Sequence, residues 1–337
     1  MTVIEAPAPA GRAGTVNRLL DRHASALPSA AAVVILLLLL AGAQAYFGNF
    51  VTPRVLSALL LDNAYLVILA VGMTMVILTG GIDLSVGSVL AFTGILGARM
   101  LAGGTSPLLV VAVMVLGGAA IGLMIGVLVQ YFDVQPFIAS LAGLFLARGL
   151  AFVVSLQSVK VTSPGILWLQ STRFQAGDWY VTPTGLLALA VLLIGAFTLA
   201  YTRFGRTVYA IGGDEQSARL MGLDVARTRV LVYVVSGVCS GLGGLVLTAY
   251  SGAGYPRNGI GTELDVIAAV VIGGTLLSGG VGYVLGSLVG VLVYGTIKTI
   301  ISFKGAEQSW TQITIGMLLL VFIVVQQVIV VRSARRR

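Results

Sequence analysis

Long apolar runs separated by short polar stretches make up most of this chain. We distinguish ten of them, at residues 30–47, 64–79, 86–101, 108–130, 137–156, 185–201, 230–250, 264–277, 283–301 and 313–331. A helix needs about 20 apolar residues to cross a bilayer, and most of the runs approach that length. The pattern predicts an all-α polytopic membrane protein with about ten transmembrane segments, broken helices among them.

Two of the runs, 64–79 and 264–277, are shorter than a full span and lead into glycine-rich segments. These segments read VILTGGIDLSVGSV at 76–89 and VVIGGTLLSGGVG at 270–282. A shift of 193 residues aligns three glycines, a leucine and a serine between them. Short, glycine-interrupted segments at corresponding places in two halves of a chain are typical of a transport pathway. We therefore expect a pathway along these two segments.

The hydroxyl side chains in and beside the two segments are the candidates to line that pathway, because they can hydrogen-bond a polar solute. The candidates are Thr74, Thr79, Ser85, Ser88, Thr275 and Ser278.

Two ionisable side chains join these candidates, each with an alternative role. Asp83 is the ionisable group nearest the first glycine break, and such groups often mark pathways. It can also cap a helix beginning at Leu84, which satisfies backbone donors freed by the break, and we favour the cap. Arg148, inside the run 137–156, can face a polar cavity, pair with a carboxylate or extend to the membrane surface. The sequence does not separate these three possibilities.

The distribution of basic residues indicates how the chain crosses the membrane. Three arginines precede the first run, five lie between 203 and 229 and four follow residue 331, together 12 of the 20 lysines and arginines. Because lysine and arginine accumulate on cytoplasmic segments, we expect both termini and the loop 203–229 in the cytoplasm. Residues 1–29 then form a disordered cytoplasmic tail, 30–331 the transmembrane domain and 332–337 a basic cytoplasmic tail.

The first run also admits a second interpretation. Ala43-Gln44-Ala45 follows a leucine run and fits a signal-peptidase site. We favour an uncleaved first span because the polar stretch before it is unusually long. Cleavage would leave the other nine spans oriented as before.

Composition excludes several classes of protein. The chain is 58% hydrophobic and 9% charged, whereas soluble proteins contain about 25% charged residues, so a soluble enzyme is excluded. One cysteine, Cys239, and one histidine, His23, exclude a disulfide framework and a multi-ligand Cys or His metal site. We expect no catalytic residue, no cofactor and no metal. The net charge of +8 reflects topology, so we expect a lipid bilayer and no nucleic acid as partner.

Motifs for energy coupling within the chain are also missing from the sequence. The three lysines, Lys160, Lys298 and Lys304, do not follow the glycine spacing of a G-x-x-x-x-G-K-[ST] loop, so the chain is not expected to bind ATP phosphates by itself. The apolar runs contain no series of Asp, Glu or His suitable for relaying protons.

Two sets of glycines repeat every four residues and predict close packing between helices. They are Gly118, Gly122 and Gly126, and Gly282, Gly286 and Gly290.

The loop 203–229 contains the signals of a short helix. Asp214 suits the N-cap, Glu215 the first turn and Gly222 the position after the last turn. We expect a helix from Glu215 to Met221 on the cytoplasmic face. Its exposed Leu220 and Met221 favour a docking surface over a connector that merely holds topology through its arginines. This docking segment consists of Asp214, Glu215, Gln216, Ser217, Ala218, Arg219, Leu220, Met221 and Gly222.

Three stretches together resemble a known family. They are GGIDLSVGSV at 80–89, TRFGRTVYAIGGDEQSARLMGL at 202–223 and ELDVIAAVVIGGTLLSGGVG at 263–282. They are similar to the permease subunits of bacterial ABC importers for monosaccharides, of the ribose, xylose, galactofuranose and autoinducer-2 type. The resemblance covers roughly residues 50–330, and the run 62–94 looks nearly collinear with the galactofuranose type.

The resemblance implies an assembly as well as a fold. It implies a dimer of permease chains in the cytoplasmic (inner) membrane, of two identical or two related chains. A cytoplasmic ABC ATPase subunit and an extracytoplasmic sugar-binding protein would complete it. The helix that fits the ATPase would correspond to residues around Glu215–Gly222, which local chemistry independently predicts to be a capped helix. ATP hydrolysis would belong to the partner, so this chain would not itself be an enzyme.

Two other functions remain open on the sequence alone. A secondary sugar transporter or facilitator would act without an ATPase and couple through Asp83 or Arg148; the sparse charge inside the apolar runs and the docking segment count against it. A membrane scaffold that transports nothing would leave the paired broken helices unexplained. We predict the permease subunit of an ATP-driven importer of a monosaccharide such as galactofuranose or ribose.

Overall fold

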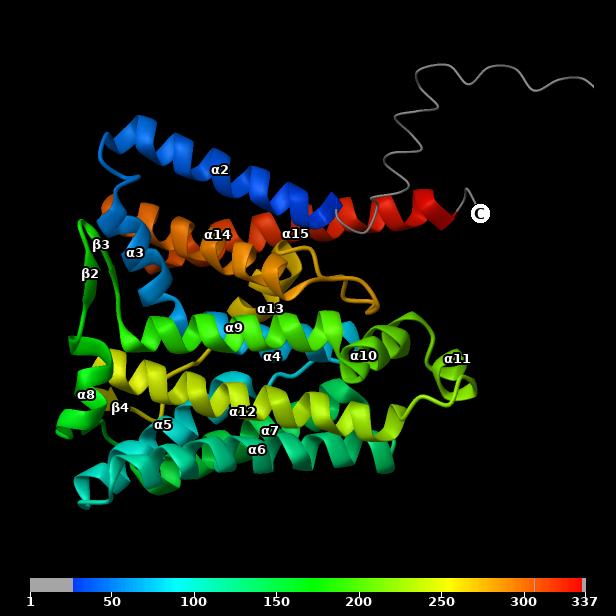
Figure 1. Ribbon diagram of the computed structural model, residues 1–337, viewed down its shortest axis with the longest axis horizontal. Helices are drawn as coiled ribbons and strands as arrows, with labels where there is room; N and C mark the ends of the chain where they lie inside the picture. The colour runs from blue at the N-terminus through cyan, green and yellow to red at the C-terminus, as the bar shows by residue number, and fades with distance from the viewer. Residues whose placement is uncertain (1–26, 306, 335–337) are drawn as a thin grey trace, which may run out of the picture.

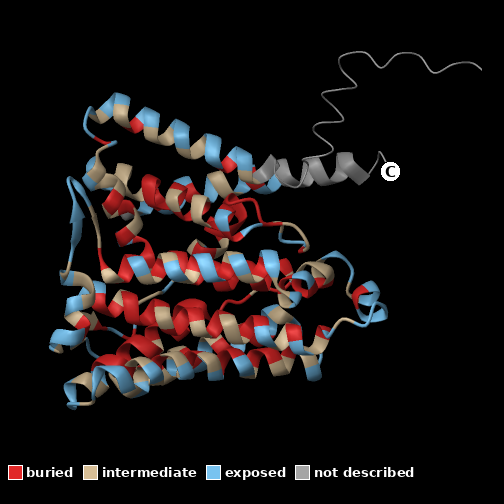
Figure 2. Ribbon diagram, in the orientation of Figure 1, coloured by how far each residue is buried: buried red, intermediate tan, exposed pale blue. Residues whose placement is uncertain are grey.

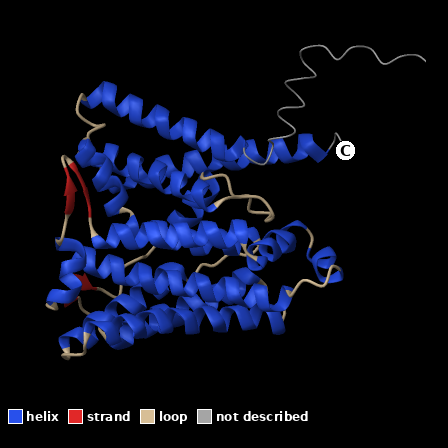
Figure 3. Cartoon of the chain, viewed as in Figure 1, coloured by secondary structure: helices blue, strands red, loops and turns tan. Residues whose placement is uncertain are grey.

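The computed structural model describes residues 27–305 and 307–334. Most of the predicted tail 1–29 and the last three residues of the tail 332–337 lie outside this range. The chain folds into helices with two small antiparallel strand pairs at one end (Figures 1 and 3). The helices are α2 (Leu27–Phe47), α3 (Pro53–Asp62), α4 (Ala64–Leu78), α5 (Val86–Ala102), α6 (Pro107–Tyr131), α7 (Pro136–Val154), α8 (Pro164–Ser171), α9 (Pro183–Tyr201), α10 (Arg203–Gly213), α11 (Glu215–Leu220), α12 (Val225–Ser251), α13 (Thr262–Ile272), α14 (Val284–Phe303) and α15 (Gln308–Ala334).

The apolar runs form these helices, but the helices differ in length. Within the described residues, six helices are long and apolar enough to cross a bilayer: α2, α6, α7, α9, α12 and α14. A seventh span is possible if α3 and α4, which meet at a bend of 54°, count as one. The helix α5 and residues 309–324 are shorter apolar helices, and α13 has 11 residues. The protein is therefore an all-α polytopic membrane protein with six to seven candidate spans, and the expected number of about ten stays a prediction.

Helix α4 forms the centre of the bundle. Every residue of α4 except Tyr65 is buried, and α4 packs against α9, α12, α13 and α14. A helix that is apolar on all sides is stable only where other helices surround it or lipid covers it. Figure 2 accordingly shows buried residues concentrated in the interior helices and exposed ones along the outer helices.

Glycines let two helix pairs approach to backbone contact, as their spacing predicts, except that Gly282 precedes α14 and lies against the Thr275 side chain. A Cβ atom at Gly118 would overlap the carbonyl oxygen of Gly237, and one at Gly122 would overlap that of Tyr233. These contacts join α6 to α12 over much of their length. In the second pair, Gly286 lies against the Gly273 carbonyl and Gly290 against the Ala269 carbonyl, which joins α14 to α13. Small residues at such crossings allow close van der Waals packing inside a bilayer.

The two ends of the bundle carry different elements. The segment with α10 and α11 lies at the end where α2 begins and α15 ends (Figure 1). The opposite end carries α8 and the strands β1 (Val159–Lys160), β2 (Phe174–Ala176), β3 (Trp179–Val181) and β4 (Ala253–Gly254). Strand β2 pairs with β3 in register Phe174↔Val181, and β1 pairs with β4 in register Val159↔Gly254.

Candidate docking helix and translocation segments

The docking segment folds as local chemistry predicts. Asp214 is the N-cap of α11, and its side chain accepts a hydrogen bond of 2.6 Å from the backbone nitrogen of Ser217. Bonds from the Ser217 side chain and backbone lower the pKa of this carboxyl below its ordinary value. After the helix, Gly222 takes the left-handed backbone conformation (φ 75°), which glycine adopts without the strain a Cβ imposes. The observed helix ends at Leu220, one residue before the predicted end.

Two large apolar side chains are exposed at the end of α11, among polar ones. Leu220 is 83% exposed and Met221 68% exposed, next to the charged side chain of Arg219. On the inner side, Ala218 is buried in a small cluster with Ile211 of α10 and Val225 of α12. The helix is therefore fixed to the bundle through one face and presents two large apolar side chains on the other.

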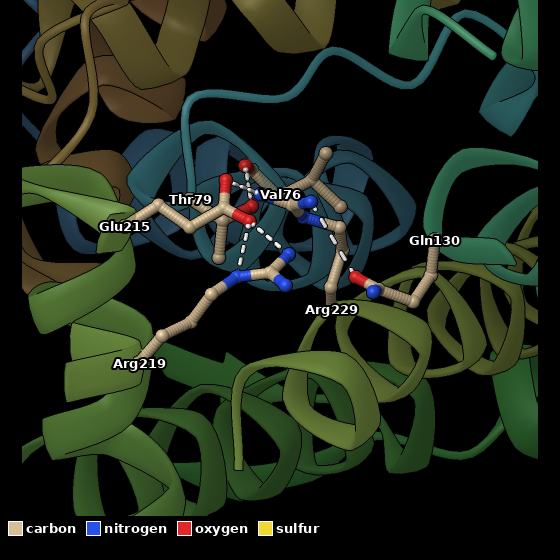
Figure 4. A network of polar contacts seen from close by, with 6 residues as sticks. All are labelled: Val76, Thr79, Gln130, Glu215, Arg219 and Arg229. Carbon is tan, nitrogen blue, oxygen red and sulfur yellow. Dashed lines mark hydrogen bonds and ion pairs between the residues drawn. The ribbon is translucent and has the colours of Figure 1, made fainter. Parts of the chain in front are cut away.

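A polar network joins α11 to α12 and α6 (Figure 4). Glu215 accepts hydrogen bonds from Arg219 Nη2, at 2.6 Å, and from Arg229 Nη2 on α12. Arg229 Nη1 also reaches Gln130 on α6, at 3.4 Å. Burial alone raises the pKa of Glu215, but its bonds and charge interactions with the two arginines outweigh this and hold the pKa below its ordinary value. Glu215 is therefore an anion at neutral pH that links α11 to α12.

The first glycine break separates α4 from α5. Helix α4 ends at Leu78, Gly80 is left-handed (φ 78°), and α5 begins at Val86. The helix thus starts two residues later than predicted, and Ser85 rather than Asp83 occupies the N-cap position. Asp83 nevertheless satisfies a backbone donor of the break, because its Oδ1 accepts bonds from the Ser85 nitrogen at 2.9 Å and the Ser85 hydroxyl at 2.6 Å.

Asp83 has a second partner that the sequence could not show. Its Oδ2 accepts a hydrogen bond of 2.6 Å from the hydroxyl of Ser236 on α12, and the residue is 1% exposed. Both carboxylate oxygens are thus directed at protein donors. This geometry fits a buried structural tie between the first break and α12.

The second glycine break follows α13 and meets the first. The backbone nitrogen of Gly280 donates a hydrogen bond of 2.9 Å to the carbonyl oxygen of Leu78, the last residue of α4. A Cβ at Gly279 would lie 2.9 Å from the nitrogen of Gly80. The repeat is only approximate in space, since the first break has one left-handed glycine, Gly80, whereas Gly274, Gly279 and Gly280 are all left-handed in the second. The two breaks nevertheless lie against each other in the fold.

A polar cavity of about 470 Å³ opens beside the first break, at the end of the bundle that carries α11. Its lining includes Thr79, Asp133, Glu215, Arg229 and Tyr233. The buried hydroxyl of Tyr233 has no hydrogen-bond partner among the described residues. The cavity is therefore lined by hydroxyl, carboxylate and guanidinium groups.

The other predicted pathway side chains are dispersed. Thr74 is fully buried and shares a hydrogen bond of 2.7 Å with Ser287 of α14. Ser88 is buried, Thr275 is buried with no bonding partner for its hydroxyl among the described residues, and Ser278 is exposed. Of the predicted set, Thr79 is the member that lines the cavity. Tyr233 and Asp133 were not predicted, because a single tyrosine in an apolar run or an aspartate in a loop does not indicate a pathway until its neighbours are known.

Arg148 binds backbone carbonyls, which the sequence did not indicate, and its charge also interacts with that of Glu263. Its Nη1 donates hydrogen bonds to the carbonyl oxygens of Pro256, at 2.6 Å, and Asn258, at 2.8 Å. These carbonyls belong to the loop that connects β4 to α13. Arg148 therefore fastens that loop to α7 at the level of the backbone.

Comparison with known proteins agrees with this architecture. The model of the family described as "Branched-chain amino acid transport system / permease component" matches residues 55–323. The chain belongs to this permease family. The inner membrane ABC transporter permease protein YjfF of Escherichia coli is 48% identical over 83% of this chain and 86% of its own. The fructose import permease protein FruG of Bifidobacterium longum is 42% identical over 90% and 91%, respectively.

A further relative has the same character. The ribose import permease protein RbsC of Escherichia coli is 37% identical over 82% of this chain and 87% of its own. No solved structure matches the chain. With its apolar helices, this permease is a multi-pass protein of the cytoplasmic membrane and the permease subunit of an ABC importer. The matched region contains the docking segment, both glycine breaks and the polar cavity.

Proposed function

We propose that this permease moves a monosaccharide, of the galactofuranose or ribose kind, inward across the cytoplasmic membrane. ATP hydrolysis by a separate ABC ATPase subunit would drive it, and an extracytoplasmic binding protein would deliver the sugar. Relatives named for fructose and ribose import support the substrate class. The transmembrane domain then comprises residues 30–331 in about ten segments, with both termini in the cytoplasm.

The observation that carries the proposal is the construction of α11. It is a capped helix, anchored by Glu215 and Arg229, that presents Leu220 and Met221 to the surroundings at one end of the bundle. Exposed apolar side chains outside the bilayer are stabilised when a partner protein covers them. We assign this surface to the ATPase, so that the docking segment Asp214–Gly222 receives its motion as a rigid body.

Translocation requires no covalent chemistry in this proposal. The sugar would pass hydroxyl and charged groups that exchange hydrogen bonds with its own hydroxyls, in place of water. We place the inner part of the route at the polar cavity beside Thr79. Substitutions of the other candidates would test the remainder of the translocation route; these are Thr74, Asp83, Ser85, Ser88, Arg148, Thr275 and Ser278. A second permease chain, identical or related, would complete the assembly.

The test is affinity purification of the chain in mild detergent with its co-expressed partners, followed by identification of the chains and an ATPase assay. We expect a stoichiometric ATPase subunit that is lost when Leu220 and Met221 are both replaced by Asp. The matched control is Arg227→Asp, an exposed position at the same end but outside the docking segment. Reconstituted vesicles with labelled ribose and galactofuranose then measure uptake with and without ATP.

The outcomes separate the alternatives. Uptake that proceeds in ATP-free vesicles by a chain with no bound ATPase would establish a secondary transporter and overturn the proposal. A second, different permease chain in the eluate would identify a heterodimer. An eluate that contains the ATPase and no other permease chain would identify a homodimer.

A further inference from the structure

Helix α10 lies between the docking helix and the two glycine breaks. It has 11 residues and is followed, after the single residue Asp214, by α11. Its Tyr209 hydroxyl donates a hydrogen bond of 2.7 Å to the carbonyl oxygen of Gly282, at the end of the second break. Its Gly212 lies against the first break, because a Cβ there would overlap the carbonyl oxygen of Leu78.

Three backbones meet at Gly212. The same hypothetical Cβ would also overlap the nitrogen of Gly280, and that nitrogen is the one that donates to Leu78. Gly280 is itself left-handed, with φ 74°. The contact therefore joins α10, the end of α4 and the second break without any intervening side chain. Close packing of backbones transmits displacement with little slack, since packed interiors are not readily compressed.

Helices α10 and α11 are joined by a single residue and by packed side chains. Asp214 closes α10 through a bond from its nitrogen to the Ala210 carbonyl, at 3.0 Å, and caps α11 with its side chain. Ile211 of α10 and Ala218 of α11 are buried in the same small cluster. A force applied to the exposed face of α11 consequently reaches α10 through covalent, hydrogen-bonded and packed contacts.

We propose that Tyr209 and Gly212 are positioning residues that couple the docking helix to both glycine-broken segments at once. Tyr209 holds the second segment at Gly282, and Gly212 holds the joint between Leu78 and Gly280. Displacement of α11 by the ATPase then moves both segments together. This inference rests on the proposed function for the source of the force, while the tie itself belongs to the isolated chain.

The chemistry of Tyr209 suits a permanent tie. Burial raises the pKa of its hydroxyl to about 12, with a further contribution from Tyr283, so the hydroxyl remains a donor over the physiological range. The bond is half-buried and does not depend on an ion pair, in contrast to the Glu215–Arg229 link, and salt therefore affects it little.

The test compares Tyr209→Phe, which removes the hydroxyl and keeps the ring, with the control Tyr201→Phe at an exposed position on α9. Hydrogen exchange is measured at residues 276–283 in the purified complex, free of nucleotide and trapped with ATP and vanadate. In the nucleotide-free state we expect exchange in Tyr209→Phe to be about fivefold faster than in the wild type. On trapping, this segment should change its exchange in the wild type and in the control, and lose that change in Tyr209→Phe.

A second pair of variants tests the backbone joint. Gly212→Ala introduces a Cβ into the three-way contact, while at the adjacent Gly213 a Cβ meets nothing within 4 Å. We expect Gly212→Ala to retain the ATPase subunit and its ATP hydrolysis but to lower ribose or galactofuranose transported per ATP by at least about tenfold. Gly213→Ala should match the wild type in both quantities.

The failures are distinguishable. A wild-type chain that binds no ATPase overturns the proposed function, and the tie is then judged on the chain alone. Unchanged exchange at 276–283 in Tyr209→Phe overturns the tie. The coupling role is overturned if both Tyr209→Phe and Gly212→Ala behave like the wild type, in the exchange change on trapping and in transport per ATP. That outcome would leave the importer function intact.

Discussion

The Ser236 hydroxyl on α12 donates a hydrogen bond of 2.6 Å to the Asp83 carboxylate at the end of the first glycine break. The other carboxylate oxygen receives two donors from Ser85. A buried carboxylate so enclosed is costly to disturb, because each donor left without its acceptor retains its desolvation penalty. This relationship connects the first glycine break to α12.

Asp83→Asn is expected to preserve most transport, since the amide oxygen still accepts from Ser85 and its NH₂ group can donate to the Ser236 oxygen. Asp83→Ala removes every acceptor and should lower the stability of the folded chain by about 2–4 kcal/mol. Melting midpoints in detergent and uptake at matched expression distinguish the two. If Asp83→Asn is stable and fully inserted but inactive, the carboxylate acts in the pathway rather than in the fold.

The contacts that fix α11 to the bundle should weaken only at acidic pH. The lowered pKa of Glu215 means that its bonds to Arg219 and Arg229 stabilise the folded state above the unfolded-state pKa and are lost as pH falls through the folded-state value. The lowered pKa of Asp214 acts in the same direction through the cap. A spin label at Met221→Cys reports the mobility of the segment; the native Cys239 is buried.

The label should be equally restrained from about pH 8 to about pH 5 and become mobile below about pH 4. Glu215→Gln should already be more mobile at neutral pH. A mobility that rises between pH 6 and 8 would contradict the assignment, because neither carboxyl titrates there.

Gly122→Ala is expected to lower the stability of the chain by about 1–3 kcal/mol, because the added methyl overlaps the backbone of Tyr233 and forces α6 away from α12. The matched control is Gly117→Ala on the same helix, where the nearest atom to a Cβ is 3.8 Å away. That control should be neutral or slightly stabilising. Thermal unfolding in detergent measures both, and equal midpoints would refute the close contact.

Arg148→Met should release the loop that connects β4 to α13, since both guanidinium bonds to the Pro256 and Asn258 carbonyls are lost. Hydrogen bonds from a charged group contribute about 1.5–3 kcal/mol each, so amides near Asn258 should exchange at least about tenfold faster. Arg99→Met, at an exposed position on α5, is the control. Exchange at Asn258 that equals that of the control would leave Arg148 without this role.

Features that depend on neighbours in sequence were predictable. The capped helix at Glu215, the helix-forming apolar runs and the glycine faces follow from spacing, propensity and backbone chemistry. The length of each span was less predictable, because α13 and α5 end at glycines and caps, and the hydrophobic pattern alone does not show where these end a helix.

Contacts between distant elements were not predictable in the same way. Nothing in the sequence around Arg148 specifies two carbonyls of a loop as its partners, and nothing around Asp83 specifies Ser236. The polar cavity likewise takes Tyr233 from α12 and Asp133 from the connection between α6 and α7. These positions are set by how helices cross, which depends on packing over whole surfaces rather than on local spacing.

The joint between Leu78, Gly212 and Gly280 consists of main-chain atoms. Side chains along the proposed route can therefore be exchanged without altering the parts that touch in this joint. The lining of the cavity can be varied to change the transported substrate while these three positions are kept fixed. Substrate selectivity and coupling to ATP hydrolysis can therefore be engineered separately.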